Sequence, residues 1–137
     1  MIDLPRFRQA QEGVYNQALK EVSAGRKRTH WMWFIFPQLT GLGHSTTAQY
    51  YGINDLDDAT TYLADPLLGG RLIEITKALL TQPNHQIDNV FDYPDNHKVR
   101  SCMTLFAHVP NADPCFQQVI NEFFNGESDP LTLNLIK

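Results

Sequence analysis

The chain of 137 residues has little cysteine and no long apolar segment. Cys102 and Cys115 are too few for a disulfide framework, and the sequence around them lacks the CxxC and paired-histidine spacings of a zinc site. The longest apolar run, Trp31–Phe36, is far shorter than the roughly 20 residues that a membrane-spanning helix needs. The start of the sequence has no basic segment leading into an apolar one. We therefore expect free thiols, no metal site, no membrane insertion and a cytoplasmic protein.

Catalytic motifs are also missing. The sequence contains no GxSxG, no HExxH and no phosphate-binding GxxxxGK[ST], and no pair of acidic residues stands apart from ordinary surface carboxylates. The formal net charge of −4 argues against nucleic acid as a partner, although Arg26, Lys27 and Arg28 form one local basic cluster. These absences indicate no cofactor. They leave open whether the protein is an enzyme and whether it forms oligomers.

What the chain does have is the composition of a folded domain. It is 42% hydrophobic and 19% charged, without low-complexity tracts, and its length suits one domain covering residues 1–137. Apolar residues recur at helical spacing along nearly the whole chain, and no segment shows a convincing alternation of period two. We therefore predict an all-α fold, a compact bundle of about seven or eight short helices joined by short loops.

Capping residues, prolines and glycines set the expected helix boundaries. Three helices open with Asp-Pro, in which the aspartate caps the helix and the proline suits its first turn. Gly25 stops the first helix, and Pro37 stops the second by disfavouring helical geometry in the residue before it. The predicted segments are Pro5–Ala24, a helix capped by Thr29 through the aromatic run, Ser45–Tyr51, Asp55–Ala64 capped by Asn54, Pro66–Thr81, a turn at Ile87–Phe91, Pro94–Val109, Asp113–Phe124, and Asp129 to the C-terminus.

The stretch RTHWMWFIFPQ, from Arg28 to Gln38, contains both tryptophans and two of the eight phenylalanines. On a short helix its large side chains divide into two groups that face different ways, as expected of a helix buried on both sides. A buried strand remains an alternative for these residues. We predict that most of the run is core and that one tryptophan projects past it, as a flat apolar wall with an indole donor.

Several motifs resemble those of a bacterial family of small all-helical proteins that is catalogued only as a domain of unknown function, and whose members sometimes carry a calpastatin label. The matching segments are RFRQAQ, HWMWFIFPQLTGLGHS, YYGI, YLADPLLGGRL and KVRSCMTLFA. The resemblance extends from Phe7 to about Leu133, and the HWMWFIFPQ run is its most specific part. The resemblance implies the all-helical fold and no established activity.

Polar residues at expected core positions identify a candidate site. Gln11 lies within the apolar stripe of the first helix, where an unpaired amide would cost about 1–3 kcal/mol, so it needs a buried helix end or a polar cavity as a partner. Arg71 flanks an apolar stripe just after Gly69-Gly70, and either reaches over a pocket rim or pairs with a carboxylate such as Asp65 or Glu74.

The helix Pro94–Val109 has an apolar side and, opposite it, a polar side that carries His97, Ser101, Thr104 and His108. Its plain interpretation is an exposed polar face. With the flanking Lys98 and Arg100, however, it supplies hydrogen-bond donors and positive charge suited to a carboxylate or phosphate. The candidate ligand-binding residues are Gln11, His30, Trp31, Trp33, Gln38, Arg71, Lys98, Arg100, Ser101 and Thr104.

Three classes of function fit this pattern. The first is a small binding domain for an anionic ligand, phosphate- or carboxylate-bearing and with a planar part, such as a nucleotide-like molecule, read by stacking and by Arg or Lys contacts. The second is a small hydrolase or transferase in the same pocket, with His30 as acid or base and Ser101 or Thr104 as a polar participant. The third is a protein-interaction domain whose aromatic run is purely structural. We prefer the first, with Arg71 and Arg100 meeting beside the aromatic run.

Overall fold

The computed structural model describes residues 2–83 and 85–136. Over these residues it contains ten helices, and its sole strand-like pairing is one isolated parallel bridge between Leu39 and Ile53. The predicted all-α fold is confirmed. The helices are α1 (Leu4–Gln11), α2 (Tyr15–Ser23), α3 (Met32–Ile35), α4 (Thr46–Tyr50), α5 (Leu56–Ala64), α6 (Pro66–Leu80), α7 (Ile87–Val90), α8 (Asp95–Ala107), α9 (Cys115–Phe123) and α10 (Pro130–Leu135).

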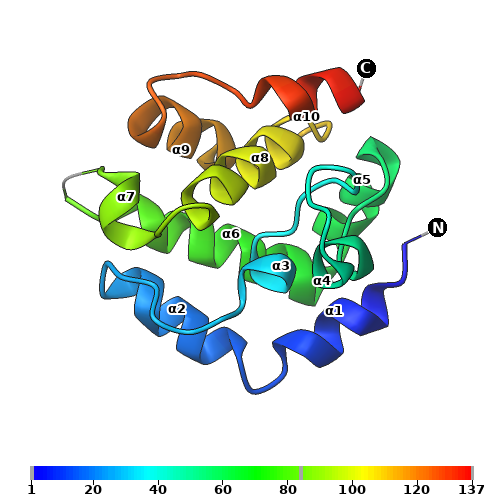
Figure 1. The fold of residues 1–137 in the computed structure, drawn as a ribbon, viewed down its shortest axis with the longest axis horizontal. Helices are drawn as coiled ribbons and strands as arrows, with labels where there is room; N and C mark the ends of the chain where they lie inside the picture. The colour runs from blue at the N-terminus through cyan, green and yellow to red at the C-terminus, as the bar shows by residue number, and fades with distance from the viewer. Residues whose placement is uncertain (1, 84, 137) are drawn as a thin grey trace.

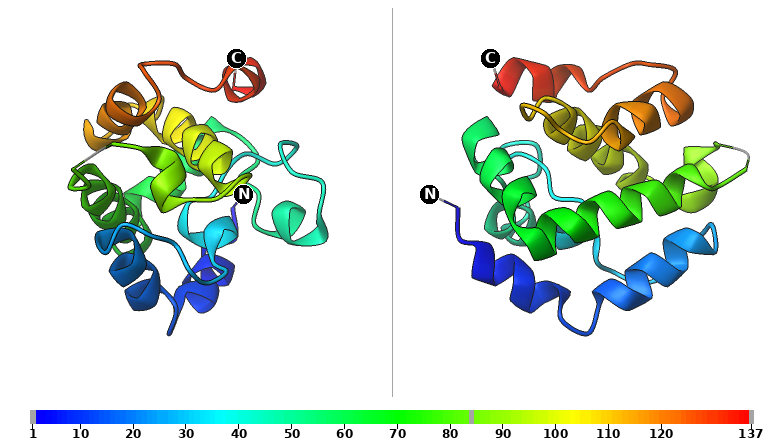
Figure 2. Two further views of the ribbon diagram at one scale, coloured as in Figure 1. Left: turned by 60° about the vertical axis from the view of Figure 1, so that its left-hand side comes forward. Right: turned by 180° about the vertical axis from the view of Figure 1, so that it is seen from behind.

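Helix α6 is the central element of the bundle (Figure 1). Helices α1 and α2 lie along one side of α6, and α8 and α9 lie on its other side, with α10 outermost against α8. Figure 2 shows the same order from behind and from the side. These helices cover α6 along most of its length, and its buried residues extend from Leu68 to Leu79. No helix within the described part of the chain is long and apolar enough to cross a membrane.

The predicted continuous helix Pro5–Ala24 is wrong, because the chain turns between α1 and α2. Gly13 has a φ of +74°, in the left-handed region that favours glycine and does not continue a right-handed helix. The turn lets both short helices follow α6, so that Phe7 of α1 and Val22 of α2 are both fully buried. This division, together with a short helix at the predicted turn Ile87–Phe91, raises the helix count from seven or eight to ten.

Three of the predicted caps are present. Asp65 and Asp129 accept hydrogen bonds from the main-chain N–H of Leu68 at 2.9 Å and of Thr132 at 3.3 Å. Ser45 does the same for α4, accepting from the Ala48 N–H at 3.1 Å. These bonds satisfy N–H groups that the first turn of a helix leaves without a partner.

Three predicted caps are wrong. Asp113 does not cap α9, whose N-cap is Pro114, although its carboxylate accepts from the Cys115 N–H at 2.9 Å. Asn54 does not cap α5; the next residue, Asp55, accepts from the Asp58 N–H at 2.8 Å. Thr29 does not cap α3, which begins after Trp31, because the hydroxyl of Thr29 donates to the carboxylate of Glu21 at 2.7 Å. At α5 the neighbouring carboxylate takes the capping bond, whereas α3 has no side-chain cap at Trp31, and sequence spacing alone does not separate these outcomes.

The aromatic run is helical at its centre and extended at its end. Helix α3 stops at Ile35, and Phe36 has φ −120° and ψ 71° ahead of Pro37, as the proline predicts. The run contributes to the core through its most buried members, Trp31, Met32, Ile35 and Phe36. Trp33 is only half-buried. It is therefore the tryptophan that projects past the core.

Candidate functional site

Helix α8 carries several of the side chains that form the candidate site. Its apolar side, with Val99, Cys102 and Phe106, is fully buried in the core, which fixes how the helix is rotated about its axis. Residues one turn apart on the other side therefore share one face. That face starts at His97, which is exposed, and continues to Ser101 and Thr104.

The predicted exposed face of α8 is wrong for Ser101 and Thr104, because residues 127–136 cover them. Ser101 Oγ donates to Asp129 Oδ2 at 2.8 Å, and Thr104 Oγ1 accepts from the Asp129 N–H at 2.9 Å. Arg100 donates from Nε to the carbonyl of Glu127 at 2.8 Å and from Nη2 to that of Ser128 at 3.1 Å. Ser101 is 8% exposed and Thr104 is fully buried. These three α8 side chains thus hold the segment that leads into α10.

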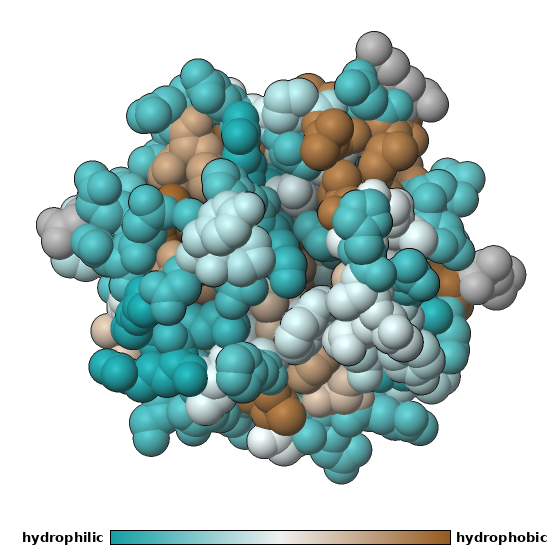
Figure 3. Space-filling model, in the orientation of Figure 1, coloured by the Kyte–Doolittle hydropathy of each residue, from teal (hydrophilic) through white to brown (hydrophobic). Residues whose placement is uncertain are grey.

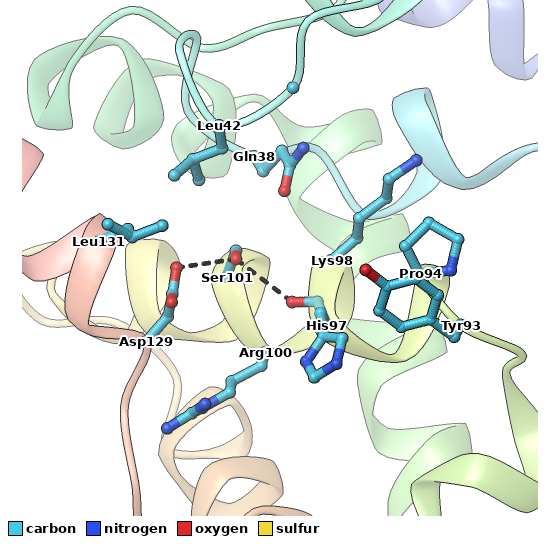
Figure 4. A pocket seen from close by; sticks show the side chains of 11 residues that line it. Gln38, Leu42, Tyr93, Pro94, His97, Lys98, Arg100, Ser101, Asp129 and Leu131 are labelled. Carbon is cyan, nitrogen blue, oxygen red and sulfur yellow. Dashed lines mark hydrogen bonds between the residues drawn. The ribbon is translucent and has the colours of Figure 1, made fainter.

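A hollow of about 400 Å³ lies at the N-terminal half of α8, and we call it the α8 hollow (Figure 4). The loop after α3 forms its second wall, the Tyr93-Pro94 turn closes one end, and the start of α10 closes the other. Its volume is within the range of small-molecule sites, and its lining mixes apolar and polar side chains. The lining residues are Gln38, Leu42, Gly43, Tyr93, Pro94, His97, Lys98, Arg100, Ser101, Asp129 and Leu131.

Lys98 is the cation with the most freedom in the α8 hollow. Its Nζ lies 5.2 Å from the centre of the Trp33 ring and 3.9 Å from Asp95 Oδ1. Both contacts stabilise a positive charge, but the second is longer than a hydrogen bond. The other oxygen of Asp95 lies 3.0 Å from Lys27 Nζ. Within the described residues, the Lys98 ammonium therefore has no carboxylate partner within hydrogen-bond distance, whereas Arg100 uses two of its nitrogens on main-chain carbonyls.

A smaller apolar cavity adjoins the α8 hollow on the side of the aromatic run. Met32, Trp33, Phe36, Ala48 and Tyr51 line it, and Gln38 and Lys98 belong to both cavities. The two shared side chains therefore stand between the polar hollow and the aromatic wall. The sequence predicts that one of the two tryptophans projects past the core. That tryptophan is Trp33, which borders the smaller cavity together with Gln38 and Lys98.

The structure brings together half of the sequence-predicted site. Trp33, Gln38, Lys98, Arg100 and Ser101 surround the two adjoining cavities. They come from two segments about 60 residues apart in the chain, and their approach depends on the packing of α3 against the core beside α8. Thr104 lies behind this group, bonded to the Asp129 main chain rather than lining the hollow.

Gln11 and Arg71 form a separate network, so the predicted meeting of Arg71 with Arg100 is wrong. Gln11 is 2% exposed and donates to the carbonyl of Phe34 at 2.7 Å and to Tyr62 Oη at 3.1 Å. Arg71 Nη1 donates to Gln11 Oε1 at 3.2 Å, with its guanidinium 5.0 Å from the centre of the Tyr15 ring. The amide of Gln11 thus finds a buried helix end, one of the two predicted alternatives.

The proposed carboxylate partners of Arg71 are occupied by other groups. Asp65 pairs with Arg8, and Glu74 accepts the hydroxyl proton of Tyr15. Burial, followed by the bond to Glu74, raises the pKa of Tyr15 well above its ordinary value. These contacts tie α1, α2 and α6 together, and this network stabilises the fold away from the α8 hollow.

Trp31 and His30 also lie outside the α8 hollow. Trp31 is fully buried, and its Nε1 donates to Glu21 Oε1 at 3.1 Å. His30 is exposed beside it and does not line the hollow that contains Ser101. The hypothesis that His30 acts as acid or base on a substrate beside Ser101 or Thr104 is therefore wrong. The imidazole that does line the hollow is that of His97, whose ring meets that of Tyr93 edge to face at 5.3 Å.

Sequence reasoning missed Asp129, Leu131 and Tyr93 as parts of the site. The sequence predicts Asp129 only as a helix cap, and its contact with Ser101 joins residues 28 positions apart. Tyr93, which is 77% exposed, and Leu131, which is 63% exposed, carry no periodic signal because each flanks the start of a helix. The sequence signal in this segment is the Asp-Pro pair, which correctly predicts where α10 begins. It does not predict that the segment covers Ser101 and Thr104 of α8.

The described residues contain no group of three or more His, Cys, Asp or Glu side chains that could hold a metal ion. The two cysteines are buried and free. Burial raises the pKa of Cys115 to about 12, aided by the neighbouring carboxylate of Asp113, so its thiol stays protonated at neutral pH.

Comparison with known proteins assigns the chain to a family. The family model described as "Protein of unknown function (DUF1810)" matches residues 1–136. The chain belongs to the DUF1810 family. A solved structure with the same fold is the crystal structure of the conserved hypothetical protein Rv1873 from Mycobacterium tuberculosis, with 44% sequence identity and a TM-score of 0.96 over 98% of this chain and 96% of that one. A search of curated proteins finds no match.

The resemblance inferred from the HWMWFIFPQ run is thus confirmed, together with the all-helical DUF1810 fold. Neither the family description nor the name of the related protein mentions an activity or a ligand. Function therefore has to be argued from the α8 hollow itself.

Proposed function

We propose that this DUF1810 protein binds a small anionic molecule in the α8 hollow, with Lys98 as the main cation. The observation that supports this most is the position of Lys98, which lines both cavities and whose ammonium lies 5.2 Å from the centre of the Trp33 ring. Its nearest carboxylate oxygen among the described residues is 3.9 Å away and belongs to Asp95, which also pairs with Lys27. An entering phosphate or carboxylate oxygen would gain hydrogen bonds that this pair does not supply.

The surroundings of Lys98 suit a ligand that also has a planar part. Tyr93 offers an exposed ring at the mouth of the hollow, whereas the Lys98 ammonium lies over the ring of Trp33, which borders only the smaller cavity of about 10 Å³. Flat aromatic surfaces favour stacking, and the Gln38 amide offers both a donor and an acceptor. A nucleotide-like molecule or an aromatic phosphate combines the two features, and the hollow is large enough for a molecule of this kind.

Binding without catalysis is the simpler form of the proposal. The hydroxyl proton of Ser101 points to Asp129 or to the carbonyl of His97, and both acceptors belong to the scaffold that holds residues 127–136. A hydrolase would need a base aimed at a nucleophile. The Ser101 geometry favours a structural hydroxyl with lone pairs facing the hollow, which can accept from a ligand.

Phosphate titration of the wild type and of Lys98→Gln tests this proposal, with binding followed by tryptophan fluorescence and by thermal unfolding. Loss of a hydrogen bond to a charged group is worth about 1.5–3 kcal/mol, so the variant should bind phosphate roughly 10–100-fold more weakly. Lys77→Gln is the matched control, because Lys77 is also on a helix with an aspartate oxygen 3.6 Å away but lies outside the hollow. It should bind as the wild type does, and so should Arg71→Ala.

Two results would contradict the proposal. Equal phosphate affinity in the wild type and Lys98→Gln would remove Lys98 from any anion site. Fluorescence and unfolding temperature indifferent to every phosphate and carboxylate tested would favour the interaction-domain alternative.

A further inference from the structure

The α8 hollow has a second charged end, and its charge is negative. Asp129 lines the hollow opposite the Lys98 end, with Ser101 between them (Figure 4). Among the described residues, the side-chain hydrogen bonds to this carboxylate all go to Oδ2, from Ser101, Thr132 Oγ1 and the Thr132 N–H. Asp129 Oδ1 accepts none of them. An ionised carboxylate can only accept, so Asp129 offers acceptors and no donor. The guanidinium of Arg100, which also lines the hollow, donates from Nε and Nη2 to the carbonyls of Glu127 and Ser128.

The two ends set opposite demands on a ligand. An anionic group beside Asp129 would meet like charge, so the anion belongs at the Lys98 end. The part of the ligand that reaches Asp129 has to donate hydrogen bonds. Ser101 also favours a donor, because its hydroxyl proton goes to the His97 carbonyl or to Asp129 Oδ2. Its oxygen keeps a lone pair that can accept a hydrogen bond. The hollow therefore fits a molecule with a phosphate at one end and hydrogen-bond donors at the other.

Hydroxyl groups are the donors that best suit this end. Aspartate and glutamate recognise the hydroxyls of ribose in nucleotide sites by the same acceptor chemistry. The neighbouring Leu131, which also lines the hollow, suits the carbon face of a sugar ring better than it suits a strongly hydrated ammonium. We infer that the anionic ligand is a sugar phosphate, free or as the ribose phosphate of a nucleotide, whose hydroxyls donate to Asp129. This inference rests on the proposed function.

The wild-type protein alone provides the first test. Ribose 5-phosphate and pentyl phosphate have the same phosphate and a carbon chain of similar length, but only the first carries hydroxyls. Calorimetric titration should show ribose 5-phosphate binding at least about 10-fold more tightly, the effect of one good hydrogen bond to a charged group. Equal affinities would overturn the inference. O-phosphoethanolamine presents an ammonium instead of hydroxyls, and tighter binding of that compound than of ribose 5-phosphate would also overturn the inference.

Asp129→Asn tests whether the carboxylate of Asp129 recognises the hydroxyls. Asparagine is also a good helix cap, so α10 should keep its start, while the charged acceptor facing the hollow is lost. The variant should lose most of the preference for ribose 5-phosphate and keep its affinity for pentyl phosphate within about 3-fold. The control is Asp113→Asn, another Asp-Pro helix start, whose carboxylate accepts from the Cys115 N–H and lies outside the hollow.

The outcomes separate this inference from the proposed function. Phosphate binding that depends on Lys98, without any preference for hydroxyls, would leave the anion site intact and refute the role of Asp129. An unchanged preference in Asp129→Asn would refute that role too. Absence of binding by inorganic phosphate, pentyl phosphate and ribose 5-phosphate alike would refute both proposals.

Discussion

At the scale of single residues, Glu21 is the strongest example of a charge used for structure. It is 4% exposed, and its carboxylate accepts from the N–H groups of Arg28 and Thr29, the hydroxyl of Thr29, the amide of Gln17 and the indole of Trp31. Burial alone would raise the pKa of Glu21, but the hydrogen bonds from Arg28, Thr29 and Gln17 outweigh it and hold the pKa at about 2. This carboxylate fixes the loop that leads into the aromatic run.

The lowered pKa of Glu21 predicts a pH-dependent contribution to stability. Its ordinary value is 4.5, so the contribution is complete above that pH and is lost as the pH falls toward 2, when the folded state takes up the proton. Glu21→Gln should lower the free energy of unfolding at pH 7 by about 2–4 kcal/mol. Urea denaturation at several pH values should show the difference from the wild type shrinking below about pH 4.5.

Glu12→Gln is the control for this measurement, because Glu12 is exposed in the turn between α1 and α2. It should change the free energy of unfolding by no more than about 0.5 kcal/mol. A Glu21→Gln difference that stayed constant from pH 7 to acid, or was no larger than that of Glu12→Gln, would show that the ionised form of Glu21 is not what stabilises the loop.

At the scale of elements, the two glycines of α6 have different roles although they are adjacent. A Cβ on Gly69 would lie 2.0 Å from the carbonyl oxygen of Leu63, because α5 and α6 meet there at close range. A Cβ on Gly70 would meet nothing within 4 Å. Gly69 is therefore required by packing. Gly70 serves no such purpose, and in a helix interior a glycine costs conformational entropy.

These two positions give a matched pair of variants. Gly69→Ala should lower the free energy of unfolding by about 1–3 kcal/mol or more, because the new methyl group pushes α5 away. Gly70→Ala should raise it by about 0.5–1 kcal/mol through helix propensity. Thermal or urea unfolding of the two variants measures the contrast. Equal effects of the two substitutions would mean that α5 and α6 do not pack as the structure shows.

Helix α10 shows how much of an element can depend on a few polar contacts. It packs against α8, and its Leu131 and Leu135 are more than half exposed, where Figure 3 shows apolar residues gathered. Its attachment comes from Thr132, which is fully buried, and from the bonds of Asp129 and residues 127–128 to α8. The wall of the α8 hollow that carries Asp129 is therefore held in place by the polar face of α8 itself.

At the scale of the whole molecule, the core joins the layers through aromatic rings. Phe106 of α8 is fully buried, with ring centres 5.6 Å from Tyr62 of α5 and 5.8 Å from Phe116 of α9. Rings at these separations contact each other and contribute beyond the area they bury. One side chain thus connects three helices.

Phe106→Ala should accordingly destabilise the protein by about 3–5 kcal/mol, since it leaves a cavity at this junction. His108→Ala, at the residue that follows α8, should cost no more than about 1 kcal/mol. Its ring is exposed and makes a single hydrogen bond, from Nδ1 to the Thr104 carbonyl at 2.8 Å. Chemical denaturation measures the free energy of unfolding of both variants. Similar decreases in the two would mean that α8 is rotated from the orientation described.

Local sequence patterns predict the fold class, most helix boundaries and the buried side of α8. These follow from short-range chemistry: apolar spacing along a helix, the caps at Ser45, Asp65 and Asp129, and the stop at Pro37 all act within about four residues. The same reasoning failed at Gly13 and at Thr29. A glycine in a helical pattern can continue it or break it, and a hydroxyl can cap or can bond to a distant carboxylate.

Which polar residues share a site depends on how the helices pack together. Gln11 and Arg71 meet across 60 positions of the chain, and Ser101 and Asp129 across 28, and no local pattern encodes either distance. Arg71 and Arg100 look alike in sequence, each at the edge of an apolar stripe, yet α6 carries the first to the Gln11 network and α8 carries the second to the Glu127 loop. The direction of a side chain on its helix is local, but what it meets depends on how the helices pack, and packing is settled by the burial of the whole core.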